Sequence, residues 1–132
     1  MIDSLWLPPA AHVVSGVLVL ATTLLALVVS AVLAWRRRPL SRFASVAFVL
    51  AQLALMVQAL MGIKLLDQGL GPMQLYIHYL GGLGPLLFFL AYYWLPRGIR
   101  NRRWTALTVT SSAFLFAVMA FGIGASYVPG GI

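Results

Sequence analysis

Four long apolar runs constrain the fold of this chain more than any other feature. They cover roughly residues 10–34, 43–66, 73–95 and 103–126. Each is long enough to cross the ~30 Å hydrocarbon core of a bilayer as a helix rising ~1.5 Å per residue. The stretches from Ala10 to Ala34 and from Thr105 to Tyr127 contain no charged residue. Because lipid offers the backbone no hydrogen-bond partner, each run is predicted to be a transmembrane helix.

The composition and the short connections indicate how these helices are arranged. Of the 132 residues, 62% are apolar and 8% are charged, whereas soluble domains are about half apolar and a quarter charged. Connections of about six to nine residues predict that neighbouring helices run antiparallel. We therefore expect an all-α integral membrane protein: an up-down-up-down bundle of four transmembrane helices, forming one domain over residues 1–132.

The basic residues predict the orientation of this bundle. Eight of the nine Lys and Arg residues lie in the first and third connections: Arg36, Arg37, Arg38, Arg42, Arg97, Arg100, Arg102 and Arg103. By the positive-inside rule these connections are cytoplasmic, so both termini lie outside. The net charge of +7 then reflects topology and attraction to anionic lipid heads, and nucleic-acid binding is not expected.

The N-terminal sequence and the span ends indicate where the chain resides. The segment MIDSLWLPPAAH carries Asp3 and lacks the basic region of a signal peptide, so we expect the first span to be retained. The simple architecture suits the cytoplasmic membrane of a bacterium or archaeon. Aromatic residues near the span ends are typical of an interfacial belt; they are Trp6, Trp35, Tyr92, Tyr93, Trp94, Trp104 and Tyr127.

The two histidines of the chain occupy matching positions in two helices of the same polarity. His12 and His78 each lie about one turn into an outside-to-inside span. Each is followed at i+3 and i+4 by small residues, in His12-Val-Val-Ser15-Gly16 and His78-Tyr-Leu-Gly81-Gly82. Since positions i+3 and i+4 share the helix face of position i, each histidine is predicted to stand above an uncrowded patch.

This pattern favours a haem site, with a simpler alternative. Helices one and three of a four-helix bundle lie on a diagonal, so His12 and His78 could ligate one haem b iron from opposite faces. In that case the metal ligands are the two histidines, and Ser15, Gly16, Gly81 and Gly82 flank the macrocycle. Small residues at this spacing also let membrane helices pack closely with no cofactor present.

The second and third spans carry a resemblance to a known protein family. The segment Gln58-Ala-Leu-Met-Gly62, continuing through Gly69 to His78, resembles the repeating four-helix unit of the haem A synthase family. The resemblance implies a histidine near the outer end of the first and third helices, a pair able to hold haem. The family's catalytic unit has a glutamate before the first histidine and often an arginine after it. Here Pro9 and Val13 stand there, and the chain has no Glu, so the resemblance supports haem binding and not haem A synthesis.

Other polar residues in the spans admit two interpretations each. Gln52 and Gln58 are expected to form hydrogen bonds between helices, or else to contact a quinone. Lys64 and Asp67 are expected to form an interfacial ion pair that contributes little to stability. In the alternative hypothesis, Lys64 pairs with a haem propionate.

The chain lacks the groups that several function classes need. It contains no cysteine, and its two acidic residues, Asp3 and Asp67, lie outside the apolar spans. Proton-coupled transport and autonomous catalysis are therefore not expected. Our first hypothesis is a bis-histidine haem subunit for electron transfer within a larger respiratory or photosynthetic assembly. The alternatives are a cofactor-free assembly subunit and a quinone-site subunit using Gln52, Gln58 or His78. The expected partners are the lipid bilayer and other membrane subunits, or a second copy.

Overall fold

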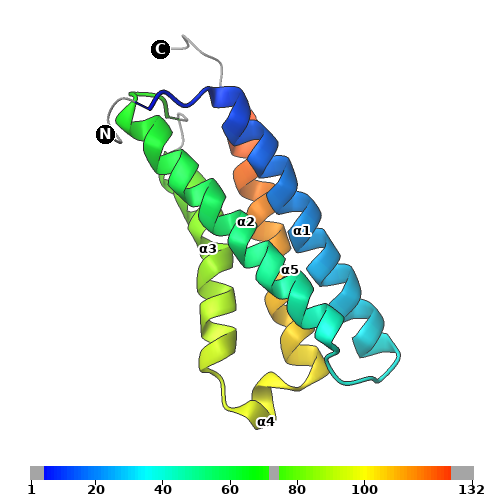
Figure 1. The fold of residues 1–132 in the computed structure, drawn as a ribbon. Coiled ribbons are helices and arrows are strands. Elements are labelled where there is room, and N and C mark those ends of the chain that lie inside the picture. The colour runs from blue at the N-terminus through cyan, green and yellow to red at the C-terminus, as the bar shows by residue number, and fades with distance from the viewer. Residues whose placement is uncertain (1–4, 72–74, 126–132) are drawn as a thin grey trace.

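Four long helices form a bundle, and the computed structural model describes them over residues 5–71 and 75–125 (Figure 1). They are α1 (Pro9–Trp35), α2 (Arg42–Asp67), α3 (Leu75–Trp94) and α5 (Arg103–Ala125), with a single turn, α4 (Arg97–Arg100), before the last. All four long helices have the length and composition of membrane spans. The predicted helical membrane bundle is therefore confirmed. Positions 72–74 and 126–127, which include parts of two predicted spans and Tyr127, lie outside the described residues.

The helices pack in a cycle, which places α1 and α3 on a diagonal. α1 packs against α2 and α5, and α3 packs extensively against α5 and less against α2. Successive long helices run in opposite directions, so α1 and α3 point the same way (Figure 1). This arrangement agrees with the predicted up-down-up-down order. It brings the first turns of α1 and α3 to the same end of the bundle, opposite the arginine-bearing connections.

The ends of α1 and α2 use the same terminating motif with different residues. The N–H of Arg38 donates to the Leu33 carbonyl at 2.9 Å, and that of Leu70 donates to Leu65 at 2.9 Å. Both are the six-residue bond of a Schellman motif, which needs a left-handed residue just before the donor. Gly69 takes that conformation with φ 77°, whereas Arg37 takes it with φ 54°. An arginine thus stands where glycine is the usual residue.

An aromatic cluster fills the half of the bundle nearest the arginine connections. The ring of Phe48 packs edge-on against Phe89 and Tyr92, with centroids 5.6 and 5.5 Å apart. Small residues such as Ala47 and Ala51 surround it in the core. The prediction that Tyr92 belongs to the interfacial belt is therefore wrong, because its ring is buried against α2. The aromatic residues that do lie exposed at span ends include Trp6, Trp35, Trp94 and Trp104.

Glycines allow α3 and α5 to approach closely in the other half. A methyl group placed on Gly81 would lie 2.8 Å from the Ala120 Cβ, and one on Gly84 would lie 2.7 Å from the Phe116 ring. Such distances are shorter than real side-chain contacts, so these two positions need glycine. The close approach is the small-residue packing that membrane helices use in place of hydrophobic driving force.

Candidate functional site

His12 of α1 and His78 of α3 meet across the diagonal of the bundle. Their ring centroids are 6.1 Å apart, and the ring planes are inclined at 60°. The two histidines therefore lie at the same level of the bundle. Each ring is half-buried rather than directed fully to the outside. Two imidazoles on opposite faces of one metal ion, each bonded at about 2 Å, would have their centres about 6 Å apart.

Each histidine ring rests on a glycine of the neighbouring helix. A methyl group on Gly62 of α2 would lie 3.3 Å from Cε1 of His12, and one on Gly124 of α5 would lie 3.2 Å from Cε1 of His78. Any larger residue at either position would push against the ring. These two glycines were not predicted as part of the site, because they belong to other helices than the histidines they seat.

The imidazole of His78 is oriented by the backbone of α5. Its Nδ1 lies 3.0 Å from the carbonyl oxygen of Ala120. A carbonyl only accepts hydrogen bonds, so Nδ1 carries the proton and Nε2 keeps its lone pair when the ring is neutral. A backbone carbonyl on the far nitrogen is the usual way in which a metal-ligating histidine is held.

The imidazole of His12 belongs to a polar network between α1 and α2. Its Nε2 lies 3.1 Å from the Gln58 side-chain amide, which also bonds the Ser15 hydroxyl. The Ser15 hydroxyl in turn lies 3.0 Å from the His12 carbonyl. The other ring nitrogen, Nδ1 of His12, is buried and has no hydrogen-bond partner. Gln58 accepts from Ser15 through its amide oxygen, so its amide nitrogen faces His12 and can only donate. Nε2 of His12 therefore accepts, and in the neutral ring the buried Nδ1 carries the proton without an acceptor.

A small cavity separates the two histidines on the side of α5. Its volume is about 80 Å³, and it is lined by His12, Val13, His78, Ala120, Phe121, Gly124 and Ala125. Cofactor pockets usually measure several hundred cubic ångströms. The space beside the two histidines is therefore too small for a macrocycle unless lining side chains rotate away. Phe121 is the side chain to move, since its ring lies 3.2 Å from a methyl placed on Gly16.

The other predicted site residues lie near the histidines, although not all beside the cavity. Ser15 and Gly16 are buried, and they contact Gln58 and Phe121 respectively. Gly81 packs on the backbone of Ala120, so the open patch expected at that position is wrong, because α5 fills it. Gly82, by contrast, has no atom within 4 Å of an added methyl group.

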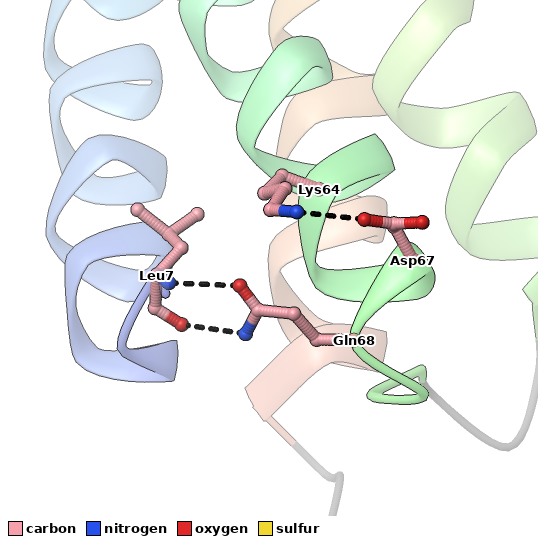
Figure 2. Close-up of polar contacts among 4 residues, drawn as sticks. All are labelled: Leu7, Lys64, Asp67 and Gln68. Carbon is pink, nitrogen blue, oxygen red and sulfur yellow. Dashed lines mark hydrogen bonds and ion pairs between the residues drawn. The ribbon is translucent and has the colours of Figure 1, made fainter. Parts of the chain in front are cut away.

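Lys64 is engaged at the same end of the bundle, about one turn beyond the histidines. Its ammonium group lies 2.7 Å from the Asp67 carboxylate, which is 62% exposed. Figure 2 shows this pair beside Gln68, whose side-chain amide bonds both the N–H and the carbonyl of Leu7 at 2.8 and 2.9 Å. This second contact fastens the segment before α1 to the end of α2. The predicted ion pair between Lys64 and Asp67 is therefore present. Pairing of Lys64 with a haem propionate stays a prediction.

The two glutamines form hydrogen bonds between helices, as one of the two interpretations predicted. Gln52 donates to the Tyr93 hydroxyl of α3 at 3.2 Å and to the Phe48 carbonyl at 3.0 Å. Gln58 reaches His12 and Ser15, and this link was not foreseen. The sequence feature that could have indicated this link is the one-turn spacing between Gln58 and Gly62, which places the amide and the glycine on one face of α2.

Comparison with known proteins adds no relative to this picture. No protein-family model, curated protein or solved structure matches the chain. Within residues 5–71 and 75–125, no group of three or more His, Cys, Asp or Glu side chains gathers as a metal site. The candidate ligand set therefore consists of two imidazoles, one from each diagonal helix.

Proposed function

We propose that this protein is a bis-histidine, b-type haem subunit for electron transfer within a larger membrane complex. The observation that carries the proposal is the approach of His12 and His78 to a centroid separation of 6.1 Å. One further feature supports it: the Ala120 carbonyl on Nδ1 of His78, which leaves Nε2 of that ring with its lone pair. A haem held by two imidazoles supplies one-electron transfer and has no open position for oxygen.

The proposal includes an orientation and a place for the site. With the arginine connections in the cytoplasm, both termini and both histidines lie toward the outer face of a bacterial or archaeal inner membrane. His12 and His78 would hold the iron, with Ser15 and Gly16 of α1 and Gly82 of α3 as the small residues nearest to it in sequence. The Phe121 ring turns away from Gly16 to admit the macrocycle. Other membrane subunits, or a second copy of the chain, deliver and accept the electron.

The test is the visible spectrum of the protein purified from cells supplied with haem precursor, oxidised and then reduced with dithionite. We expect a sharp α-band on reduction and one haem per chain. His12→Ala and His78→Ala should each abolish the six-coordinate spectrum, and added imidazole should partly restore it. Gln52→Leu is the matched control, since Gln52 bonds Tyr93 away from the histidines. A His78→Ala protein with a full haem complement would refute the proposal.

A second function, a cofactor-free assembly subunit, is favoured by one observation. The cavity beside the histidines is about 80 Å³, and α3 and α5 are in backbone contact at Gly81. On this alternative the histidines are polar residues that tie helices together through Gln58 and Ala120. The same spectrum separates the two functions. A colourless protein that remains unchanged on addition of haemin would support the assembly subunit.

A further inference from the structure

The two arginine-bearing connections enclose a pocket at the end of the bundle opposite the histidines. It has a volume of about 460 Å³. Four arginines from distant parts of the sequence line it, Arg37 and Arg38 from the first connection and Arg102 and Arg103 from the other, with Asn101 and Trp104 beside them. The packing of α1 against α5 brings the two connections together. The pocket is open on one side and independent of any cofactor at the histidines.

Within residues 5–71 and 75–125, no acidic side chain pairs with these four arginines. The chain has two acidic residues. Asp3 precedes α1 in the sequence, and Asp67 lies at the opposite end of α2 from this pocket, paired with Lys64. Like charges gathered in one pocket repel one another unless an anion lies between them. The pocket therefore favours an anion from outside the chain.

One of the arginines has an unfilled hydrogen-bonding position. Nε of Arg103 is buried and lacks a partner among the described residues. Its guanidinium carbon lies 5.9 Å from the centre of the Trp104 ring, which holds the planar group beside the pocket. A buried guanidinium nitrogen with no partner is costly, so its presence at this place points to a ligand that accepts hydrogen bonds. Guanidinium groups suit phosphate oxygens because they can donate two parallel bonds.

The position of the pocket identifies the source of the phosphate. It lies beside the end of α1 and the start of α5, where Trp35 and Trp104 are both exposed. Indole rings at span ends mark the headgroup layer of a bilayer. A phosphate at this level belongs to a phospholipid whose acyl chains continue along the apolar surfaces of α1 and α5. Basic pockets between spans are known to take such headgroups.

We propose that this arginine pocket binds the phosphate of an anionic phospholipid headgroup. Arg38 and Arg102 contribute one guanidinium from each connection, and Arg103 supplies the buried donor. The bound lipid thereby joins the α1–α2 connection to the start of α5. This binding is a specific contact, distinct from the general attraction of a basic surface for an acidic membrane.

The experiment is native mass spectrometry of the detergent-purified full chain titrated with phosphatidylglycerol or phosphatidylcholine. The wild-type protein should retain one phosphatidylglycerol at concentrations where phosphatidylcholine is lost. Two double variants remove the same charge from the same two connections. Arg38→Gln with Arg102→Gln changes the pocket and should weaken retention at least tenfold. Arg36→Gln with Arg97→Gln changes arginines that do not line it and should weaken retention less than threefold. Equal losses in both would overturn the proposal.

Two further measurements cover folding and the source of the phosphate. Arg103→Lys keeps the charge but removes Nε. We expect this variant to lose phosphatidylglycerol retention while keeping the helical circular dichroism of the wild-type protein. Retention unchanged in this variant would contradict the role given to Arg103. Inorganic phosphate at 10 mM (about the upper physiological range) and constant ionic strength should leave the bound lipid in place, because the acyl chains also hold it. Displacement by inorganic phosphate would overturn the lipid assignment.

Discussion

The two ends of the bundle are held together by different physical means. At the arginine-bearing end, an aromatic cluster of Phe48, Phe89 and Tyr92 packs edge to face among alanines, and Ser30 and Thr110 are buried polar side chains in the same half. At the histidine end, polar groups occupy the corresponding positions, and Ser15, Gln58 and the imidazoles are linked by hydrogen bonds. The first arrangement gains dispersion contact between rings, and the second is a hydrogen-bonded network; each end also has a buried polar atom without a partner, Oγ of Ser30 at the first and Nδ1 of His12 at the second.

This difference suggests a division of labour within one short chain. Aromatic packing offers no chemistry, but it fixes the helices relative to one another. Polar groups in lipid are expensive and are generally kept for a function. Changes at the aromatic end should therefore lower stability without altering the histidine pair, whereas a change in the polar network at the histidine end should also alter the imidazoles. The following substitutions test that separation, beginning with the largest expected effect.

Phe48→Ala should cause the largest loss of stability. The Phe48 side chain is 1% exposed and touches both Phe89 and Tyr92. Removing it leaves a cavity, and we expect a loss of about 3–5 kcal/mol in the free energy of unfolding, measured by denaturant titration in detergent. Phe43→Ala on the same helix is the control, since Phe43 is 61% exposed and its loss should matter little. Comparable losses in the two variants would deny the aromatic cluster its structural role.

Gly81→Ala should destabilise the contact between α3 and α5. The added methyl group would lie 2.8 Å from the Ala120 Cβ and 3.1 Å from that residue's backbone, which has no flexible end to move. Overpacking of this kind costs about 1–3 kcal/mol. Gly82→Ala meets open space and gains helix propensity, so it should be neutral or stabilising by up to ~1 kcal/mol. Thermal unfolding of the two neighbouring variants gives the comparison, and equal midpoints would contradict it.

Gln58→Leu should cost about 1–2 kcal/mol, because Nε2 of His12 and the Ser15 hydroxyl would lose their shared partner. Gln52→Leu should cost under about 0.5 kcal/mol, since its bond to Tyr93 is exposed. The more telling result concerns the imidazoles: Gln58→Leu should change the nitrogen chemical shifts of His12, and Gln52→Leu should leave them unchanged. Identical shifts in both variants would mean that Gln58 does not orient the ring.

The fold was largely predictable from the sequence because lipid restricts the solutions so strongly. Charge-free runs of membrane length have to be helices, and short connections make them antiparallel. For α1 and α2 the predicted limits differ from the observed ones by one residue at each end. The turn α4 was missed, since a single turn after Pro96 leaves no periodic signal. The burial of Tyr92 was missed as well, because proximity to a span end does not reveal which face a ring occupies.

The site was predictable only within single helices. Matching positions for His12 and His78 follow from helix polarity, and the structure brings the rings together. Spacing along one helix shows which residues share a face, but it does not show which neighbour packs there. Spacing along one helix therefore could not predict three contacts between helices: the packing of the histidine rings on Gly62 and Gly124, the hydrogen bond from Gln58 to His12, and the packing of α5 on Gly81.

The smallest effect on stability is expected at the Schellman motifs that end α1 and α2. Gly69 and Arg37 both adopt left-handed backbone at a helix end, and only glycine does so without strain. Gly69→Ala should lower the free energy of unfolding by about 1 kcal/mol, whereas Arg37→Gly should raise it by about 0.5–1 kcal/mol. Both values come from denaturant titration in lipid-free detergent.

Arg37→Gly carries a second consequence that distinguishes function from stability. The variant removes one of the arginines that line the pocket between the connections. If the pocket binds an anionic headgroup, the protein should become more stable in neutral detergent and yet gain less stability when phosphatidylglycerol is added. A residue kept only for helix termination would show the first change without the second. The arginine at this position would then be a strained helix cap that is retained for its charge.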